Sequence, residues 1–269
     1  MDVPATIFEH ESTVRFGCFF VLFVLIAAAE ILAPRRPREL KKSFRWFGNL
    51  SVHVLNSVII YAGFPLLPVG MALLCARKGW ALLNHIPLPD AVAILLSILA
   101  LDLLIFTQHF LLHRIGLLWR LHRMHHTDVD LDITSALRFH PLEIILSMLI
   151  KLAAVATLGP PALAVFLFET LLNAMAMFSH ANLRLPLPLD ALLRRVVITP
   201  DMHRIHHSVI MEESLHNYGF NISWWDRLFG TYQAQPASGH LGMTLGIEGF
   251  RDARYSNLSQ MILAPFNKG

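Results

Sequence analysis

The stretch LDLLIFTQHFLLHRIGLLWRLHRMHH, residues 101–126, joins a long apolar segment directly to a cluster of histidines. Its first half continues a hydrophobic run that begins at residue 91, and about 20 such residues cross a ~30 Å hydrocarbon layer as one helix. Its second half places His109 and His113 four positions apart and repeats histidine at positions 122, 125 and 126. The stretch therefore predicts a membrane helix over residues 91–112 that ends at a metal-binding site.

The whole chain shares this apolar character. Of its 269 residues, 55% are hydrophobic and 15% are charged, which is more apolar surface than a soluble domain of this length can bury. The net charge of +3 is too small to indicate nucleic-acid binding. The only two cysteines, Cys18 and Cys75, lie in separate apolar runs, so no thiolate metal site is expected. The composition predicts an all-α integral membrane bundle whose metal ligands are nitrogen or oxygen atoms.

Further apolar segments precede residues 91–112. Residues 14–33 are long enough for one span and lack the small-residue cleavage site of a signal peptide, so they predict a retained membrane anchor. Residues 50–75 predict a second span. The connection between them is strongly basic, and cytoplasmic loops carry an excess of Lys and Arg, which places it on the cytoplasmic side. Its basic residues are Arg35, Arg36, Arg38, Lys41, Lys42 and Arg45.

A fourth apolar region, residues 142–179, is interrupted by Gly159, Pro160 and Pro161. These residues end a helix and turn the chain, so the region predicts a hairpin, either a tilted pair of spans or a re-entrant loop. In both cases its two ends lie on one face of the membrane. From about residue 180 onward the sequence becomes polar and predicts a histidine-rich cytoplasmic cap. We expect one membrane domain over residues 1–269, with four to five hydrophobic segments and a catalytic region over residues 91–232.

Eleven of the fifteen histidines lie between residues 109 and 216. They form an HxxxH pair and two HxxHH triplets, and positions i, i+3 and i+4 share one face of a helix, so each set is expected to direct its imidazoles at one point. The hairpin would bring two isolated histidines to the same place. The predicted metal ligands are His109, His113, His122, His125, His126, His140, His180, His203, His206 and His207. For His216, a ligand role and a role beside a ligand both stay open.

Imidazole ligands suit Fe, Zn, Cu or Ni, and the ligand type alone does not choose between them. Ten candidates exceed the needs of one ion, so two ions are predicted. A hydrolytic pair would be expected to have bridging carboxylates, but the nearby acids do not stand at the helical positions of the histidine sets: Asp128, Asp130, Asp132 and Asp201. The pattern therefore favours activation of O₂ as a co-substrate. The sequence contains no dinucleotide-binding, phosphate-loop or haem-attachment motif, so electrons are expected from a separate protein.

Four polar residues in or beside apolar helices are candidates to hydrogen-bond a ligand imidazole: Asp102, Glu143, Glu169 and Asn173. Asp102 lies two helical turns before His109, and a role in helix packing is its alternative. Glu143 follows His140 by three residues and either orients that ring or begins a helix after Pro141. The other two share a helix face that leads toward His180. No catalytic residue beyond the metal ligands is predicted.

In this order along the chain, the motifs resemble the fatty acid hydroxylase and sterol desaturase superfamily. The resembling stretches extend over nearly half of the sequence: HFLLH at 109–113, LWRLHRMHH at 118–126, RFHPLE at 138–143, FSHAN at 178–182, PDMHRIHHS at 200–208 and NYGFNISWWDRLFGTY at 217–232. The resemblance implies a membrane di-iron oxidoreductase that acts on a lipid with O₂. It further implies an external electron donor of the ferredoxin or cytochrome b5 type.

Residue by residue, the resemblance places the superfamily's metal ligands on the HxxxH pair, on both HxxHH triplets and on His180. Some members carry a further histidine close to that position, whereas this chain has Ala176 there, so the resemblance assigns no tenth ligand and His140 is the candidate. The closing signature is expected to form cap structure rather than to catalyse. Its matching residues are Tyr218, Gly219, Trp225, Asp226 and Gly230.

The expected reaction is hydroxylation of a lipid C–H bond by a monooxygenase, and desaturation by an enzyme of the same superfamily is the alternative. The substrate is open and includes sterols and fatty acyl chains. A histidine-rich metal transporter or sensor is the alternative from another class. It is disfavoured because the histidines gather on one side of the predicted membrane and the first two spans offer no polar relay. The absence of an appended electron-transfer domain and of a retrieval signal favours a bacterial inner membrane over the endoplasmic reticulum.

Overall fold

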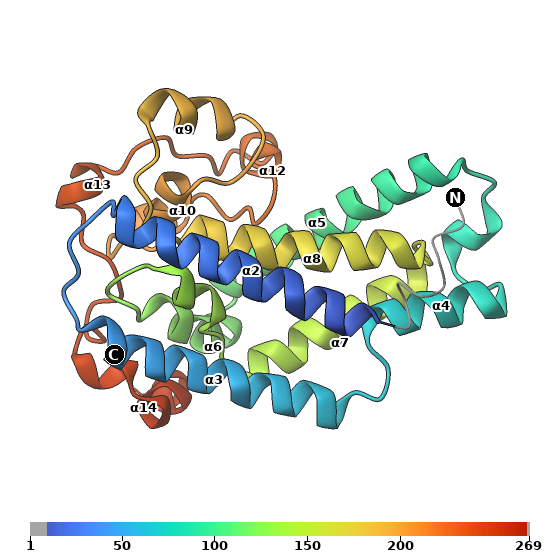
Figure 1. Cartoon of the computed structure of the whole chain (residues 1–269), viewed down its shortest axis with the longest axis horizontal. Helices are drawn as coiled ribbons and strands as arrows, with labels where there is room; N and C mark the ends of the chain where they lie inside the picture. Colours follow the sequence, from blue (N-terminus) through green and yellow to red (C-terminus); the bar gives the residue numbers. More distant parts are fainter. Residues whose placement is uncertain (1–9, 268–269) are drawn as a thin grey trace.

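The computed structural model describes residues 10–267, and this part of the chain consists of helices joined by loops, without a β-strand (Figure 1). Five segments are long and apolar enough to cross a membrane, which confirms the predicted helical membrane bundle. They are α2 (Glu11–Leu32), the segment Lys42–His85, α5 (Asp90–Arg114), α7 (Pro141–Leu158) and α8 (Ala162–His180). The segment Lys42–His85 contains α3 (Lys42–Gly63), α4 (Pro68–Lys78) and the 3₁₀ helix η1 (Leu82–His85).

The remaining elements are short and belong to the polar end of the molecule. Figure 1 shows the long helices running side by side, with the short ones and the C-terminus gathered at one end. We call residues 181–267 the cap. The short elements are α6 (Gly116–His126), η2 (Ile133–Leu137), α9 (Leu187–Leu193), α10 (Pro200–His206), α11 (Met211–Ser214), α12 (Trp224–Leu228), α13 (Gly239–Gly242), η3 (Ala253–Ser256), α14 (Leu258–Leu263) and η4 (Ala264–Phe266).

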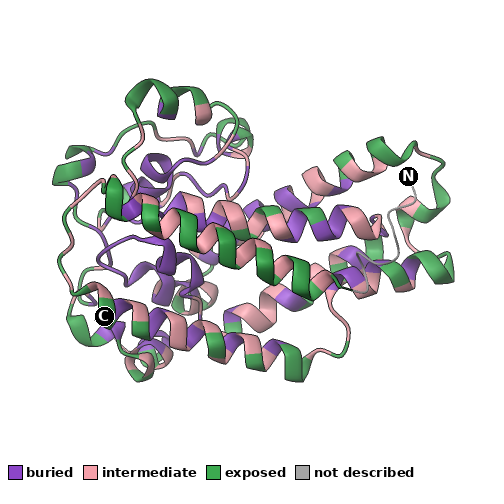
Figure 2. Ribbon diagram, in the orientation of Figure 1, coloured by how far each residue is buried: buried purple, intermediate pink, exposed green. Residues whose placement is uncertain are grey.

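The long helices expose apolar side chains outward, as a lipid-facing surface requires. Along α2, Phe16, Leu25 and Leu32 are exposed, and Val58 on α3 and Leu95 on α5 are exposed as well. Buried residues are concentrated instead where α6 and the cap meet the bundle, as the purple parts of the ribbon in Figure 2 show. The well-packed part of the protein is therefore the end that carries the histidines.

The predicted hairpin is present, with α7 and α8 joined through Gly159, Pro160 and Pro161. Gly159 adopts φ +64° at the end of α7, and an added Cβ would lie 2.7 Å from the Cβ of Ala81, so glycine suits both the backbone conformation and the space. Both helices are candidate spans of 18 and 19 residues. The hairpin returns the chain to the cap, where His180 ends α8.

The second predicted span, residues 50–75, is divided differently in the structure. Helix α3 already begins at Lys42, so part of the basic cluster is helical rather than loop. It ends at Gly63, and a new helix, α4, starts at Pro68. Pro65 and Pro68 explain the break, because a proline cannot donate the backbone hydrogen bond that continues a helix.

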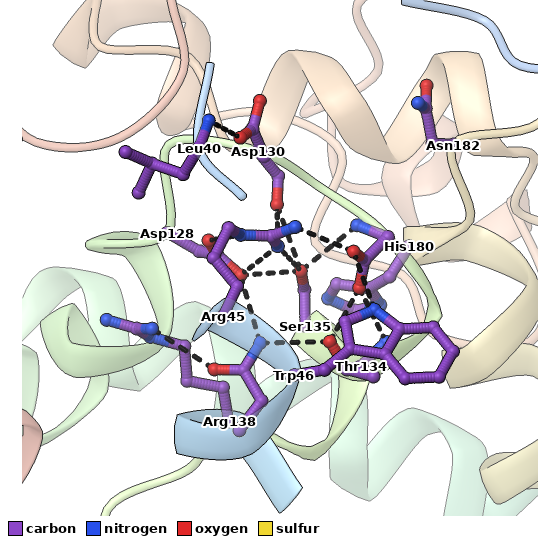
Figure 3. Close-up of polar contacts among 12 residues, drawn as sticks. Leu40, Arg45, Trp46, Asp128, Asp130, Thr134, Ser135, Arg138, His180 and Asn182 are labelled. Atoms are coloured by element: carbon purple, nitrogen blue, oxygen red, sulfur yellow. Dashed lines mark hydrogen bonds and ion pairs between the residues drawn. The ribbon is translucent and has the colours of Figure 1, made fainter. Parts of the chain in front are cut away.

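A buried network of charges joins α3 to the segment that follows α6 (Figure 3). Arg45 is fully buried and donates to both carboxylate oxygens of Asp128 at 2.8 and 2.7 Å and to Asp132 at 2.6 Å. Burial alone would raise the pKa of Asp128, but the Arg45 charge holds it well below its ordinary value. Close by, buried Arg138 donates to the carbonyl of Met124 at 2.9 Å. The network holds both ends of the segment 128–138 in place, Asp128 through Arg45 of α3 and Arg138 through the carbonyl of Met124 in α6.

Glu30, near the end of α2, is a second buried anchor. Its Oε1 accepts backbone N–H groups from Ile133 and from Asn182, both at 2.8 Å. One carboxylate thus holds η2 and the first residues after His180 in place. The acid that interrupts the first apolar span therefore supports the polar end of the molecule.

Candidate metal centre

Ring nitrogens of nine of the ten predicted ligands meet in two groups, and within each group they lie within 4.8 Å of one another. The first group is His109, His113, His122, His126 and His206. The second group is His125, His180, His203 and His207. Among the described residues, the two groups hold no carboxylate or thiolate, so the donor set is all imidazole. Whether these nine bind metal stays a prediction.

Each HxxHH triplet is divided between the two groups instead of pointing at one, which differs from the expectation. In α6, His122 and His126 belong to the first group and His125 to the second. In α10 and its C-cap, the assignment is reversed, with only His206 in the first group. At 3.6 residues per turn, positions i+3 and i+4 differ in direction by about 100°. One triplet can therefore contribute ligands to two clusters, one on each side of its helix.

The ring nitrogens that face one another are spaced as ligands of an ion would be. In the first group, Nε2 of His109 lies 3.1 Å from Nε2 of His122 and 2.9 Å from that of His206. In the second group, Nε2 of His180 lies 3.0 Å from Nε2 of His125 and 3.1 Å from that of His203. Two nitrogens bound at ~2.1 Å and at a right angle are separated by ~3.0 Å. The residues therefore fit a metal ion in each group.

The outer ring nitrogens of three histidines of the first group are held by acceptors. Nδ1 of His109 donates to the carbonyl of Tyr218 at 2.7 Å, and Nδ1 of His206 donates to the carbonyl of His216 at 2.8 Å. Nδ1 of His122 donates to Glu143 at 2.8 Å. A proton fixed on Nδ1 leaves Nε2 as the free donor atom that a metal requires.

Burial keeps these imidazoles neutral. Burial and then the neighbouring histidines hold the pKa of His125, His126 and His203 well below its ordinary value, and the pKa of His206 falls to about 3. Neutral imidazole is the form that binds metal. The buried Nε2 of His113 and both ring nitrogens of His207 find no hydrogen-bond partner among the described residues, and one nitrogen of each ring is free to bind an ion.

His140, the tenth predicted ligand, lies outside both groups. It is the N-cap of α7, where its Nδ1 accepts the backbone N–H of Leu142 at 3.2 Å. Its Nε2 lies 3.2 Å from the carbonyl of Ile262. Both ring nitrogens are thus engaged elsewhere. His216 is also outside the groups. Its backbone carbonyl accepts from the ring of His206, while its own ring donates to the carbonyl of Glu212.

The predicted acids have other partners than expected. Glu143 contacts the ring of His122 and not that of His140. Asp102 hydrogen-bonds no imidazole and instead accepts from Asn221 at 2.7 Å and Trp225 at 2.8 Å. Glu169 does not hydrogen-bond His180 either, and its two oxygens accept from Arg15 and Lys151. Asn173 lines a cavity described below.

The closing signature supports the first group through its backbone, a role that the sequence did not predict. Asp226 accepts the N–H groups of Tyr218 at 2.7 Å and Gly219 at 2.9 Å, and burial raises its pKa to about 6. Asn217 adopts φ +56° and donates to the carbonyl of Met202 at 3.0 Å. These contacts aim the carbonyls of residues 216 and 218 at His206 and His109.

A cavity of about 300 Å³ lies between α2, α3, α5, α7 and α8 and reaches the first histidine group. His109, His122 and Glu143 line one end of it, and Arg15, Lys151 and Glu169 line the other. The walls between them are largely apolar and include Ile60, Ile105, Leu112, Ile144, Met148 and Leu172. The second histidine group does not line this cavity.

The fatty acid hydroxylase family model matches residues 94–231, just over half of the chain. Ornithine lipid hydroxylase OlsE of Rhizobium tropici is 31% identical over 160 residues, which are 58% of this chain and 47% of that protein. Alkylglycerol monooxygenase of Homo sapiens is 28% identical over 154 residues, which are 57% of this chain and 34% of that protein. The chain thus spans half or less of the length of these relatives. No solved structure matches it significantly.

Proposed function

Because this chain belongs to the fatty acid hydroxylase family, we propose that it is a di-iron monooxygenase that hydroxylates a C–H bond of a membrane lipid. One observation carries the proposal: two all-histidine groups that could each hold a metal ion lie side by side in a membrane bundle, and the first of them borders a largely apolar cavity. The names of two relatives describe a lipid hydroxylase and a monooxygenase. Hydroxylation places one atom of O₂ in the lipid and reduces the other to water with two electrons and two protons.

Two bound iron ions would supply the reductive activation of O₂. The five histidines of the first group would hold one ion and the four of the second group the other. Glu143 keeps the proton of His122 on Nδ1 and thereby keeps Nε2 free. The apolar walls of the cavity exclude water and align a hydrocarbon chain beside His109 and His122.

An external electron donor is part of the proposal, and the corner between α5 and α6 is suited to receive it. His113 is the one histidine of the nine that is not fully buried. Its ring lies 4.8 Å from that of Trp119, which also lies 5.3 Å from His126. Arg114 and Arg120 are exposed on either side. Their positive charge would attract an acidic donor of the ferredoxin or cytochrome b5 type.

We further propose that the cap faces the cytoplasm of a bacterial inner membrane. The connection between α2 and α3 lies at the cap end, where Arg36 donates to the carbonyl of His240 at 3.0 Å. The basic cluster of residues 35–45 occupies this connection and the first turn of α3, and positive charge favours the cytoplasmic side. A bacterial relative supports the choice of membrane.

The test combines metal content with product analysis on the full chain purified in detergent. We expect about two irons per chain by plasma mass spectrometry, as a two-metal oxidation centre requires, and their loss in a variant with His125→Ala and His206→Ala, one change in each group. The matched control is His85→Ala, in η1. With reductant, donor and ¹⁸O₂, one labelled oxygen atom should enter a membrane lipid.

A folded wild-type protein without bound metal would refute the proposal. Iron-dependent formation of an alkene without oxygen insertion would replace hydroxylation by desaturation. The His85→Ala control separates loss of a ligand from the general effect of removing an imidazole.

A further inference from the structure

The cavity has two chemically different ends, and this difference points to the kind of lipid that it binds. We infer that the lipid enters with a polar group that carries hydrogen-bond donors, a hydroxyl or an ammonium group, directed toward the histidines and received by Asn56 and Glu143. The inference rests on the proposed function, because it names the substrate class of the same site. Neither contact requires an iron ligand to move.

The end beside the histidines presents acceptor oxygens without partners. Asn56 is 5% exposed and donates through Nδ2 to the carbonyl of Phe139 at 2.8 Å, which leaves its Oδ1 free. Because a carbonyl can only accept, this contact fixes the orientation of the amide. Glu143 is 2% exposed, and its Oε2 has no partner while Oε1 accepts from His122. Burying an acceptor without a hydrogen bond is unfavourable, so both oxygens favour a ligand that donates.

Glu143 lies directly beside the first histidine group, and Asn56 lines the same cavity next to Phe139. Phe139, which receives the Asn56 amide, stacks on His125 with ring centroids 4.5 Å apart and lies 6.3 Å from the ring of His122. Glu143 touches His122 directly, and all three of Asn56, Glu143 and His122 line the same cavity. A group held there would lie next to the carbon that is oxidised.

The opposite end offers donors instead. Lys151 follows Glu143 by eight residues on α7, which places it ~12 Å further along the helix axis. Both oxygens of Glu169 are already occupied, one by Lys151 and one by Arg15, each at 2.7 Å. Arg15 also pairs with Glu11 at 2.8 Å, so the charges of this end are balanced. A ligand donor therefore finds no free acceptor on Glu169, and no unpaired carboxylate attracts an ammonium group. The cavity thus favours one orientation of an amphipathic lipid, with its donor-bearing group at the histidine end.

The inference is tested by binding without turnover, using two probes of which only one carries hydrogen-bond donors. These are 1-O-hexadecylglycerol, with two hydroxyl groups, and the same molecule with both hydroxyls methylated. Native mass spectrometry of the purified full chain, without reductant, measures their competition. We expect wild type to prefer the diol by roughly 10-fold or more, which corresponds to one or two net hydrogen bonds.

The variant Asn56→Leu should reduce this preference to within about 3-fold, because one acceptor is removed. Asn84→Leu is the control, since it makes the same side-chain change in η1, outside the lining of the cavity, and it should keep the preference. Equal binding of the two probes by wild type would overturn the inference, and this comparison needs no variant to fold. An unchanged preference in Asn56→Leu would overturn the assignment to Asn56.

The outcome is separable from that of the proposed function. Oxidation of a lipid together with equal binding of the probes would leave the monooxygenase standing and remove the inference. A clear preference for the diol without iron or lipid oxidation would do the opposite. In that case the cavity would be a lipid-binding site without the proposed chemistry.

Discussion

The two histidine groups are built from one residue type at one spacing, yet they occupy different surroundings. The first group lines the cavity, includes the half-buried His113, and has outer nitrogens tied to Glu143 and to loop carbonyls. The second group is fully buried, and Nδ1 of His125 and of His203 has no partner in the described part of the chain. The comparison teaches that two sites with the same ligand type can differ through the residues that surround the ligands.

The elements that serve the groups are partly shared. Helices α6 and α10 contribute to both groups, because each HxxHH triplet is divided. Helix α5 contributes only to the first group and α8 only to the second. Substitutions on α5 and α8 are therefore the cleanest way to separate the groups, while a change that moves α6 or α10 should affect both.

The largest effect is expected for His109→Ala and His180→Ala, one ligand from α5 and one from α8. Each change removes one donor from a single group, so iron should fall from about two to about one per chain, with activity lost in both variants. Metal analysis of each purified variant provides the measurement. If either single change removed both irons, the two groups would bind metal as one cooperative unit and the distinction between them would fail.

A change that affects both groups is expected from Arg45→Met. It leaves Asp128 and Asp132 buried without their cation, and breaking a buried ion pair from one side costs about 3–5 kcal/mol. The thermal unfolding temperature should fall by roughly 10 °C, with metal lost from both groups on the same curve. Lys41→Met, an exposed cation four residues earlier, is the control. A normal unfolding temperature in Arg45→Met would show that the network does not hold α6 in place.

A selective loss from the first group is expected from Asp226→Asn. The amide can accept through one oxygen only, so one of the N–H groups of Tyr218 and Gly219 is left without its acceptor, and the carbonyls that orient His109 and His206 lose their support. Supporting residues of this kind typically alter metal affinity by about 10–100-fold. Titration with a competing chelator should show one weakened ion and one unchanged ion. Asp252→Asn, which caps η3, serves as the control.

A pH effect is expected from Asp201, which lies on α10 and thus beside both groups. Burial would raise its pKa, but the hydrogen bond from Arg35 and the charge of Arg204 lower it to about 2. The pKa of Asp201 in the unfolded chain is about 3.9, so its ionised carboxylate contributes about 2 kcal/mol to the stability of the folded protein above pH ~4. This contribution is lost as the pH falls toward 2. The free energies of unfolding of metal-free wild type and Asp201→Asn should therefore converge over that range. A constant difference between them would contradict this assignment.

The sequence predicted the hairpin and nine histidines that the structure brings together, because helical spacing and apolar length are local properties. Gly159 and the two prolines mark the turn directly. The division of each triplet was not predicted, since it depends on which helices pack on either side of α6 and α10. The prediction that His122, His125 and His126 direct their rings at one point was wrong, because the neighbouring helices use the ~100° between i+3 and i+4 to separate two clusters.

The supporting contacts were harder to predict for a different reason. The acceptors of His109 and His206 are backbone carbonyls, and a carbonyl leaves no residue-specific trace in a sequence. Asp226 was visible within the closing signature, but its partners are backbone N–H groups eight and seven residues earlier. Glu143 was assigned to the nearest histidine along the chain, whereas the fold brings His122 to it from α6.

The smallest effect on metal content and stability is expected for His140→Ala. This variant sharpens the comparison because it tests whether His140 belongs to either histidine group. Its Nδ1 accepts the N–H of Leu142 and its Nε2 faces the carbonyl of Ile262, so the ring acts as a cap of α7. Loss of a cap costs about 1 kcal/mol. Iron content should stay unchanged while stability falls by that amount, in contrast to His122→Ala. Loss of an iron from His140→Ala would make His140 a tenth ligand, which would require its ring to leave both of these partners.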